Sequence, residues 1–403
     1  QNFPNRVVAG LLNVVIFPRE APAAPDAGTP PAGEWRAAWI SYIELQGMDY
    51  TSAEAFRAGA AAMMDRCAGL GLNTVIVQVR PFGDALYPSA LFPWSHICTG
   101  VQGVSPGFDP LDILLTEAHS RGLSFEGWIN PYRLQASASS PGTLAAGNLA
   151  NTHPDWVAAA GGGLYLNPAI PEAAAYVVEG VAELVRTYPV DGVHFDDYFY
   201  PTTDPAIDAA RFAASGAADL AEWRRQNVTA LVKAAHDAVK AADPTLRFGV
   251  SPQGNPDNDM SQQYSDVRGW LAAGSEDAVV DYLCPQLYWG YGYTLSNGSR
   301  RFAYENILAE WLAMPRGSAA LYVGLGAYRI GEGDGGSNGD SVSGWSTGRA
   351  LADQVGTLRA AGAGGYALYR YGSLFQNTAW PQLAEAECAA LTAANAPDGG
   401  RAG

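Results

Sequence analysis

Short apolar runs rich in β-branched and aromatic residues alternate along the chain with Ala-rich stretches of helical spacing. This alternation predicts strand-helix units built around a parallel sheet. Eight strands are predicted, at 35–43, 73–80, 123–130, 190–197, 246–252, 279–288, 321–327 and 365–370. Helices are predicted between and after them, at about 52–70, 109–121, 171–187, 216–242, 261–273, 300–314, 348–361 and 380–394. Eight strands that are each followed by a helix favour an α/β fold of the (β/α)8 TIM-barrel type over a doubly wound sheet.

The predicted barrel is a single large domain over 34–395 with a short N-terminal extension. Residues 1–33 form that extension, which ends in a linker rich in Pro and Ala, and 396–403 are predicted to be a flexible tail. The apolar run Val7 to Phe17 resembles the end of a signal peptide, although an ordinary strand has the same pattern. We therefore expect a protein that is exported, either secreted or held in the cell envelope.

Charge and motif content exclude several classes of function. The net charge is −16 with no run of basic residues, so a nucleic-acid partner held by phosphate contacts is not expected. The 4 cysteines are far apart and the 5 histidines have no ligand spacing, so no metal site is predicted and disulfide pairing stays open. No nucleophile-elbow, P-loop or dinucleotide motif directly follows a predicted strand, which implies no cofactor, and nothing in the sequence implies a protein partner.

Polar and aromatic residues gather at the C-terminal ends of five predicted strands, where barrels of this type carry their active groups. If Val193 and Phe195 face the surrounding helices, then His194, Asp196 and Tyr198 face the barrel mouth, because successive strand residues point to opposite sides. The same alternation predicts an inward ring of Arg80, Asn130, Asp196, Gln253 and Gln286. Satisfied core groups or helix caps would explain any one of these residues, but explain the whole set less well.

Aromatic residues are also predicted around this mouth, where their flat faces suit sugar rings. Arg80 and Arg133 are expected to hold a carboxylate or to orient a catalytic Asp. The predicted aromatic set is Trp94, Trp128, Tyr132, Tyr198, Tyr200, Tyr288 and Trp289. Together these residues predict a carbohydrate site.

Long motifs in one order give the chain a resemblance to glycoside-hydrolase-like family 10. They include RAAWISY (36–42), NTVIVQVRPFGDALYPS (73–89), GWINPYR (127–133), DGVHFDDYFYP (191–201) and YLCPQLYW (282–289), and the similarity extends over about 36–370. The resemblance implies a (β/α)8 barrel, an exported bacterial protein and hydrolysis of glycosidic bonds. Some members of the family are linked to peptidoglycan glycan strands that lack stem peptides, so a cell-wall polysaccharide is the expected substrate.

The resemblance makes Asp196 and Asp197 the catalytic candidates. It implies that Arg80, Asn130, Tyr132, Arg133 and Tyr288 line the substrate groove. The remaining candidates for substrate binding come from the strand ends and are Asp84, His194, Tyr198, Tyr200, Gln253, Gln286 and Trp289.

Glycoside hydrolysis usually needs two carboxyl groups that flank the bond. Asp196 is one candidate, and the second stays open among Asp197, Asp84, Glu126, Glu44 and Asp257. Because the ends of strands seven and eight carry no carboxylate, a substrate-assisted route is a further hypothesis. In it the N-acetyl group of the sugar attacks its own anomeric carbon, Asp196 orients that group, and Asp197 or a neighbour protonates the leaving oxygen.

A second class of function is a carbohydrate-binding barrel that has lost catalysis and attaches to cell-wall glycan. The aromatic mouth would serve either class. A metal-dependent polysaccharide deacetylase is disfavoured, because the His ligands that it would need are missing from the sequence.

Overall fold

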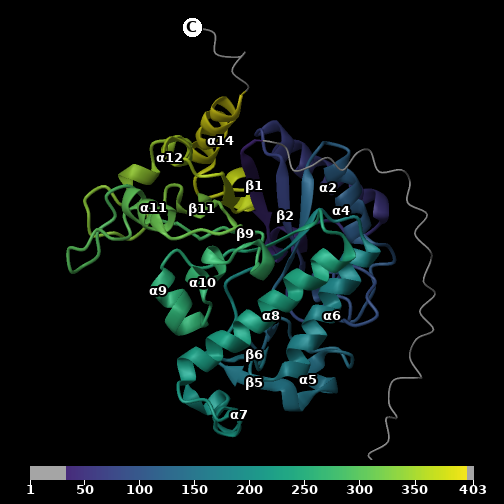
Figure 1. Ribbon diagram of the computed structural model, residues 1–403. Helices are drawn as coiled ribbons and strands as arrows, with labels where there is room; N and C mark the ends of the chain where they lie inside the picture. Colours follow the sequence, from purple (N-terminus) through teal and green to yellow (C-terminus); the bar gives the residue numbers. More distant parts are fainter. Residues whose placement is uncertain (1–32, 397–403) are drawn as a thin grey trace, which may run out of the picture. The chain divides into compact units, whose positions relative to one another are not determined.

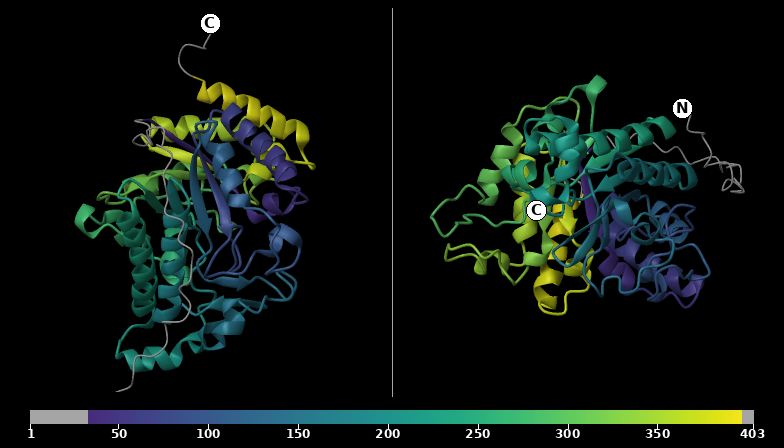
Figure 2. Two further views of the ribbon diagram at one scale, coloured as in Figure 1. Left: turned by 90° about the vertical axis from the view of Figure 1, so that its right-hand side faces the viewer. Right: turned by 90° about the horizontal axis from the view of Figure 1, so that it is seen from below.

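The computed structural model describes residues 33–396 and contains a closed parallel barrel with helices around it (Figures 1 and 2). The strand order in the sheet is β10-β9-β8-β7-β3-β2-β1-β12-β11, and every pair in it is parallel. The strands are β1 (Trp35–Ile40), β2 (Thr74–Arg80), β3 (Ser124–Ile129), β7 (Gly192–Phe195), β8 (Arg247–Val250), β9 (Tyr282–Leu283), β10 (Ala320–Leu321), β11 (Val323–Gly326) and β12 (Gly365–Tyr369).

The barrel closes through its seventh strand. Only Tyr322 separates β10 from β11, so the two form one strand position; β10 pairs with β9, and β11 pairs with β12. Because β12 also pairs with β1, the ring is complete. The predicted (β/α)8 barrel is confirmed.

Helices follow the strands close to the predicted places, and short polar side chains cap several of them. Ser52, Asp109 and Asp219 each accept a hydrogen bond from a backbone N–H of the first turn, which satisfies a donor that the helix itself leaves unpaired. The main helices are α2 (Ala53–Gly69), α4 (Pro110–His119), α6 (Pro171–Thr187), α8 (Leu220–Ala242), α10 (Val267–Ala272), α11 (Tyr304–Ala313), α12 (Ala350–Ala360) and α14 (Pro381–Asn395).

Shorter elements lie in the loops between these units. The long segment between β3 and α6 holds a small antiparallel sheet of β4 (Arg133–Gln135), β6 (Gly163–Leu166) and β5 (Val157–Ala160). Short helices are α1 (Tyr42–Gln46), α3 (His96–Thr99), α5 (Leu149–Thr152), α7 (Ala209–Ser215), α9 (Pro256–Asn258) and α13 (Tyr371–Phe375). Single turns are η1 (Pro154–Trp156), η2 (Pro205–Ile207), the π-helical η3 (Asp259–Gln263), η4 (Ser275–Asp277), η5 (Ala327–Arg329) and η6 (Ser343–Trp345).

Proline explains why two of the strands end earlier than predicted. The strand predicted at 246–252 ends at Val250, two residues before Pro252, and the one predicted at 279–288 ends at Leu283, before Pro285. Proline has no backbone N–H to donate to a neighbouring strand, so regular pairing stops there. The segments after β8 and β9 remain adjacent through a parallel bridge between Gln253 and Gln286.

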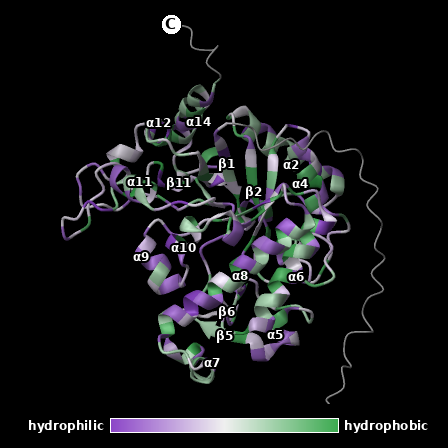
Figure 3. Cartoon of the chain, in the orientation of Figure 1, coloured by the Kyte–Doolittle hydropathy of each residue, from purple (hydrophilic) through white to green (hydrophobic). Residues whose placement is uncertain are grey.

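Buried apolar residues form two clusters, one on the outer face of the barrel and one inside it. Val75, Val77 and Phe125 pack outward in the large core that the helices share. Trp39 and Tyr282 belong to a smaller cluster inside the ring, together with other buried residues of the inward faces. The helices in Figure 3 carry both hydrophobic and hydrophilic residues, as expected for helices with one face on the barrel.

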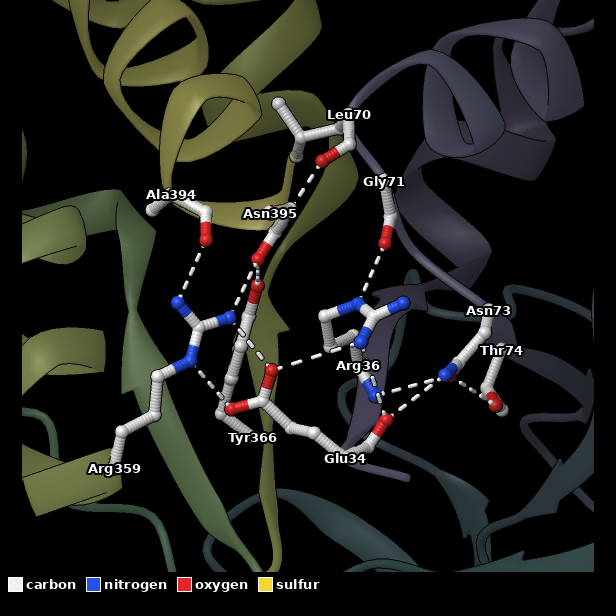
Figure 4. A network of polar contacts seen from close by, with 10 residues as sticks. All are labelled: Glu34, Arg36, Leu70, Gly71, Asn73, Thr74, Arg359, Tyr366, Ala394 and Asn395. Carbon is white, nitrogen blue, oxygen red and sulfur yellow. Dashed lines mark hydrogen bonds and ion pairs between the residues drawn. The ribbon is translucent and has the colours of Figure 1, made fainter. Parts of the chain in front are cut away.

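A polar network at the N-terminal end of the barrel joins the first and last elements (Figure 4). Arg359 of α12 donates two hydrogen bonds to the carboxylate of Glu34, at 2.7 and 2.6 Å, and a third to the carbonyl of Ala394 at 2.7 Å. Asn395 of α14 donates to the carbonyl of Leu70 at 2.9 Å. These contacts tie α12, α14 and the start of β1 together.

Several expectations fall on the ends of the chain. The apolar run Val7 to Phe17 and nearly all of the predicted N-terminal segment and C-terminal tail lie outside the described residues. Within 33–396, no helix combines the length and apolar character that a membrane crossing requires, and no three His, Cys, Asp or Glu side chains are grouped to hold a metal ion. The four cysteines are unpaired.

Candidate active site

Asp196 and Asp197 follow directly after β7, at the C-terminal mouth of the barrel, and both are buried. The Oδ2 atom of Asp196 accepts hydrogen bonds from Trp128 Nε1 at 2.9 Å and Asn130 Nδ2 at 3.0 Å. Its Oδ1 atom accepts one from the backbone N–H of Tyr198 at 3.2 Å. Side chains at the end of the neighbouring strand β3 therefore hold Asp196.

Asp197 faces the strands on the other side of β7. Its Oδ1 atom accepts a hydrogen bond from Gln286 Nε2 at 2.9 Å, and the same amide donates to the carbonyl of Ser251 at 3.1 Å. Gln253, which follows β8, also stabilises the charged form of Asp197. The two adjacent carboxyl groups thus lie on opposite sides of one strand end, each with its own partners.

Burial changes the acidity of the pair. It raises the pKa of Asp196 to about 7, an effect that the charge of Asp197 reinforces and the guanidinium of Arg133 opposes. Burial also raises the pKa of Asp197, while hydrogen bonds from Gln286 and Gln253 act against this. One carboxyl of the pair therefore keeps its proton close to neutral pH, which is the condition for a general acid.

Arg133 supplies the positive charge next to the pair. Its guanidinium donates two hydrogen bonds of 3.2 Å to the carbonyl of Pro81 and lies 4.4 Å above the ring of Phe82. Its backbone N–H donates to Asn130 Oδ1 at 2.9 Å. Asn130 therefore connects Arg133 to Asp196, as a side chain that positions both.

Aromatic rings form the wall on the β9–β12 side of the mouth. Tyr288 stacks on Tyr369 with ring centroids 5.5 Å apart, and Tyr328 meets Tyr288 edge-on at 5.5 Å. Trp289, which was also expected at the mouth, instead stacks on Phe302 at 5.0 Å and packs against the large core outside the barrel. In the segment after β7, Tyr198 is 53% exposed and open to a ligand.

The prediction that the Arg80 side chain points into the barrel is wrong. The register between β2 and β3 shifts between Gln78 and Arg80, and this irregularity turns Arg80 to the outer face. Its guanidinium lies 3.7 Å above the ring of Phe92, and a Cβ atom at Gly180 of α6 would collide with both side chains. Arg80 is a buried contact between the barrel and α6.

Four other predicted binding residues are buried away from the mouth. His194 is fully buried, with Trp39 and Ser251 on one ring nitrogen and Tyr282 on the other, and burial lowers its pKa to about 3. It is therefore a neutral part of the barrel interior. Asp84 accepts from Phe82 N and Gln102 Nε2, Tyr132 is 1% exposed in the outer core, and Tyr200 is 2% exposed and accepts from Asn227 of α8.

Three of the other carboxylates that were considered as the second catalytic group bind partners away from the pair. Glu44 pairs with Arg370 and caps α1 from within that helix. Glu126 is buried inside the barrel, where it accepts a hydrogen bond from Tyr282. Asp257 is 57% exposed and forms ion pairs with Arg301 and Arg268. Among the candidates, Asp197 alone lies beside Asp196.

Sequence reasoning missed two contributors to this site. Trp128 was predicted as part of an aromatic wall, but it donates its indole N–H to Asp196. Asp259 in η3 is fully buried, and its Oδ1 atom accepts from the backbone N–H of Gln253 at 2.9 Å, while Oδ2 has no hydrogen-bond partner within the described part of the chain. Burial raises the pKa of Asp259 well above its usual range. No sequence pattern indicates that this carboxyl group holds the backbone of Gln253.

Comparison with known proteins agrees with this geometry. The family model described as Glycosyl hydrolase-like 10 matches residues 34–338. The chain belongs to this family. The matched residues include Asp196, Asp197 and every side chain named above as a partner of that pair, so the site is built from the part of the chain that the family shares.

Two curated relatives are similar over most of the chain. Glycosyl hydrolase YngK of Bacillus subtilis (strain 168) is 37% identical over 323 residues, which are 74% of this chain and 61% of the relative. Glycosyl hydrolase DigH of Escherichia coli (strain K12) is 36% identical over 299 residues, which are 67% of this chain and 65% of the relative. The chain therefore spans slightly less than two thirds of the length of these relatives.

Solved structures with low sequence identity share the fold. The β-galactosidase from the psychrophilic Marinomonas ef1 has a TM-score of 0.55 at 12% identity, with 90% of this chain and 59% of that chain covered. α-L-Fucosidase isoenzyme 2 from Paenibacillus thiaminolyticus has a TM-score of 0.54 at 15% identity, with 88% and 49% covered. At this identity the similarity supports the barrel fold alone.

Proposed function

We propose that the protein is a glycoside hydrolase that cleaves glycosidic bonds of a polysaccharide with Asp196 and Asp197. The observation that carries this proposal is the pair itself: two buried carboxyl groups at the C-terminal mouth of the barrel, held by different partners, with the pKa of one raised to about 7. Membership of a glycosyl hydrolase-like family supports it.

The order of titration suggests a role for each carboxyl group. Burial and the charge of Asp197 raise the pKa of Asp196 to about 7, so we assign Asp196 as the group that keeps a proton and gives it to the leaving oxygen, with Asp197 ionised. The ionised Asp197 can then stabilise positive charge that develops at the anomeric carbon. This assignment reverses the roles in the sequence-based hypothesis, in which Asp197 or a neighbour was the proton donor.

We propose that the substrate is a cell-wall glycan with N-acetyl sugars and that the acetamide is the nucleophile. Its oxygen bonds to the anomeric carbon while the bond to the leaving sugar breaks and Asp196 protonates the leaving oxygen. Asp197 accepts a hydrogen bond from the acetamide N–H. Water then opens the cyclic intermediate and returns a proton to Asp196. The adjacency of the two carboxyl groups and the commitment of Glu44, Glu126 and Asp257 to other contacts support this route.

The test is digestion of peptidoglycan glycan strands stripped of stem peptides, with released saccharides identified by mass spectrometry. The wild-type protein is compared with Asp196→Asn and Asp197→Asn, and with Asp237→Asn, which removes an exposed carboxylate that pairs with Lys233 on α8. We expect fragments from the wild type and from Asp237→Asn, and none from the other two variants. Cello-oligosaccharides, which have no N-acetyl group, should stay intact.

Each alternative gives a different result. Equal cleavage of cello-oligosaccharides would overturn the substrate-assisted route and leave glycosidase activity standing. Binding of the strands without fragments from any variant would instead favour the carbohydrate-binding barrel that has lost catalysis.

We also propose that the protein acts outside the cytoplasm, where a cell-wall substrate is found. The apolar run at Val7 to Phe17 supports this proposal, and it lies outside the described residues. Cell fractionation with an antibody to the barrel tests it, with signal expected in the envelope or medium. Signal confined to the cytoplasm would contradict it.

A further inference from the structure

A hollow lies at the same end of the barrel as the carboxyl pair, between the loop after β11 and the segment after β12. It is a cavity of about 220 Å³, and its lining includes Tyr328, Glu332, Arg370, Gln376, Asn377 and Trp380. Both segments follow the C-terminal ends of their strands, which is the end of the barrel that carries Asp196. None of these six residues was a candidate in the sequence.

The cavity has two exposed aromatic walls. Trp380 is 40% exposed, and its Nε1 atom donates a hydrogen bond to Glu332 Oε1 at 2.8 Å. Its ring packs so closely on Gly331 that a Cβ atom there would collide with it. Tyr328 is 37% exposed. Because these contacts hold the Trp380 ring in place, it offers a preformed flat surface.

The polar groups of the cavity are fixed from behind. Arg370 pairs with Glu44 through Nη1, and the backbone N–H of Gly372 donates to the same Glu44 oxygen at 2.8 Å. Asn377 Oδ1 accepts from the backbone N–H of Trp380 at 2.8 Å, which fixes the loop that carries the indole. The guanidinium, the Glu332 carboxylate and the exposed Gln376 amide supply donors and acceptors of mixed charge.

This mixture selects one class of ligand. A neutral pyranose has apolar C–H faces that pack on aromatic rings, and hydroxyl groups that both donate and accept hydrogen bonds. An anionic sugar would meet the Glu332 carboxylate, and a purely apolar ligand would cover the Gln376 amide without giving it a hydrogen-bond partner.

Aromatic contacts connect the cavity to the carboxyl pair. The Tyr328 ring, which lines the cavity, lies 5.5 Å from the ring of Tyr288 and 6.1 Å from that of Tyr369. The charges of Asp197 and Asp196 contribute to raising the pKa of Tyr369, so this ring lies within electrostatic reach of the pair. The cavity is thus connected through Tyr328 to two rings on the side of the mouth that faces the pair.

We propose that this cavity is a saccharide subsite, which holds one neutral pyranose unit of the polysaccharide next to the bond that is cleaved. The inference rests on the proposed function and names a further part of the same site. Trp380 stacks on the sugar, and Arg370 and Gln376 hydrogen-bond to its hydroxyl groups. This position would let the enzyme select chains that extend past the cleavage point toward the β11 and β12 side.

The test measures binding apart from hydrolysis. Titration calorimetry is carried out in the Asp196→Asn background with the N-acetylglucosamine hexasaccharide and, separately, with glycan strands stripped of stem peptides. Adding Trp380→Ala or Gln376→Ala should raise the Kd for these glycans, by about tenfold for Trp380→Ala. The matched control is Tyr291→Ala, whose ring is 41% exposed and lines a different cavity. It should leave the Kd unchanged.

The outcomes separate this inference from the proposed function. Hydrolysis by the wild type together with an unchanged Kd in both subsite variants overturns the subsite alone. Weaker binding by both variants without any hydrolysis supports the subsite and overturns the enzymatic proposal. If Trp380→Ala shows no thermal unfolding transition, it is not folded. The Kd values of Gln376→Ala and Trp380→Phe then test the subsite instead. Failure of the Asp196→Asn protein to bind either glycan also overturns the subsite.

Discussion

Two neighbouring carboxyl groups differ in this barrel because their partners differ. Trp128 and Asn130 hold Asp196 from the β3 side, whereas Gln286 and Gln253 stabilise Asp197 from the β8 and β9 side. Burial disfavours the charge on both, and the charge on Asp197 adds to this at Asp196. Ionisation of Asp196 therefore costs free energy in the folded protein.

Asp196→Asn is expected to make the protein more stable above neutral pH. The pKa of Asp196 is about 7 in the folded protein against an ordinary value of 3.8, so the folded state binds this proton more tightly than the unfolded state does. This contribution to stability is complete below about pH 4 and is lost as the pH rises to about 7. The difference in free energy of unfolding between variant and wild type should therefore grow across that range.

Urea unfolding at pH 4, 5.5, 7 and 8 measures this difference. Asp237→Asn is the matched control, because its ion pairs with Lys233 and His236 lower the pKa of that carboxyl and the sign is reversed. A wild-type protein more stable than Asp196→Asn at pH 8 would show that Asp196 is not buried in the way described.

Individual residues also show where sequence reasoning stops. Alternation along strands correctly placed Asn130, Asp196 and Gln286 together at the mouth, because regular strands obey a period of two. It failed at Arg80, since one register shift reverses every later side chain and leaves no mark in the sequence. Asp259 could not be predicted, because its burial depends on how η3 packs beneath Gln253.

At the scale of elements, the loop that follows the carboxyl pair is anchored to α8 by a buried ion pair. Arg224 of α8 bonds to both oxygens of Asp208, at 2.9 and 2.6 Å, and neither side chain is exposed. The same guanidinium donates to the carbonyls of Thr203 and Asp204 in the segment that follows the pair. The anchor thus fixes the path of the chain after β7.

Arg224→Ala is expected to destabilise the protein by about 3 to 5 kcal/mol, because it leaves the Asp208 carboxylate buried without its partner. Arg225→Ala on the same helix is the control. It removes a partly exposed pair with Glu222 and should cost less than about 1 kcal/mol. Chemical denaturation of both variants measures the difference, and equal small effects would show that the pair does not anchor the loop.

The bounds of a helix or strand were predicted correctly where the local sequence pattern determines them. The predicted helix at 171–187 matches α6 in both bounds, because a proline begins it and its apolar spacing is regular. The strand predicted at 279–288 shrinks to β9 since Pro285 interrupts pairing, and the one predicted at 321–327 divides at Tyr322. Such interruptions depend on the neighbouring strand as well as on the strand itself.

At the scale of the whole molecule, the count of strand-helix units predicted the barrel. How the ring closes was not predictable, because it depends on the pairing of β1 with β12, which lie at opposite ends of the described chain. The network in Figure 4 adds long-range contacts to this pairing, with Arg359 bound to Glu34 and Asn395 bound to Leu70. It lies at the N-terminal end of the barrel, whereas the carboxyl pair lies at the C-terminal end.

Arg359→Ala is therefore expected to reduce stability without changing catalysis. Losing the bidentate contact with Glu34 and the bond to Ala394 should cost about 1 to 3 kcal/mol, because these bonds are charge-assisted but partly solvated. The melting temperature should fall, while the kcat of the folded protein stays unchanged. Arg349→Ala removes an exposed pair with Asp353 and serves as the control. A large loss of kcat in Arg359→Ala would contradict this separation of the two ends.

The pH dependence of glycan-strand cleavage, measured for the wild type beside Asp196→Asn, is the most direct test of the central claim. We expect the wild-type cleavage rate to fall as the pH rises above about 7, since the proton donor is then ionised. We expect the rate of Asp196→Asn to be lower by about 10²- to 10⁴-fold and not to fall over this pH range. Cleavage by Asp196→Asn at the wild-type rate, or with the wild-type pH dependence, would contradict the account.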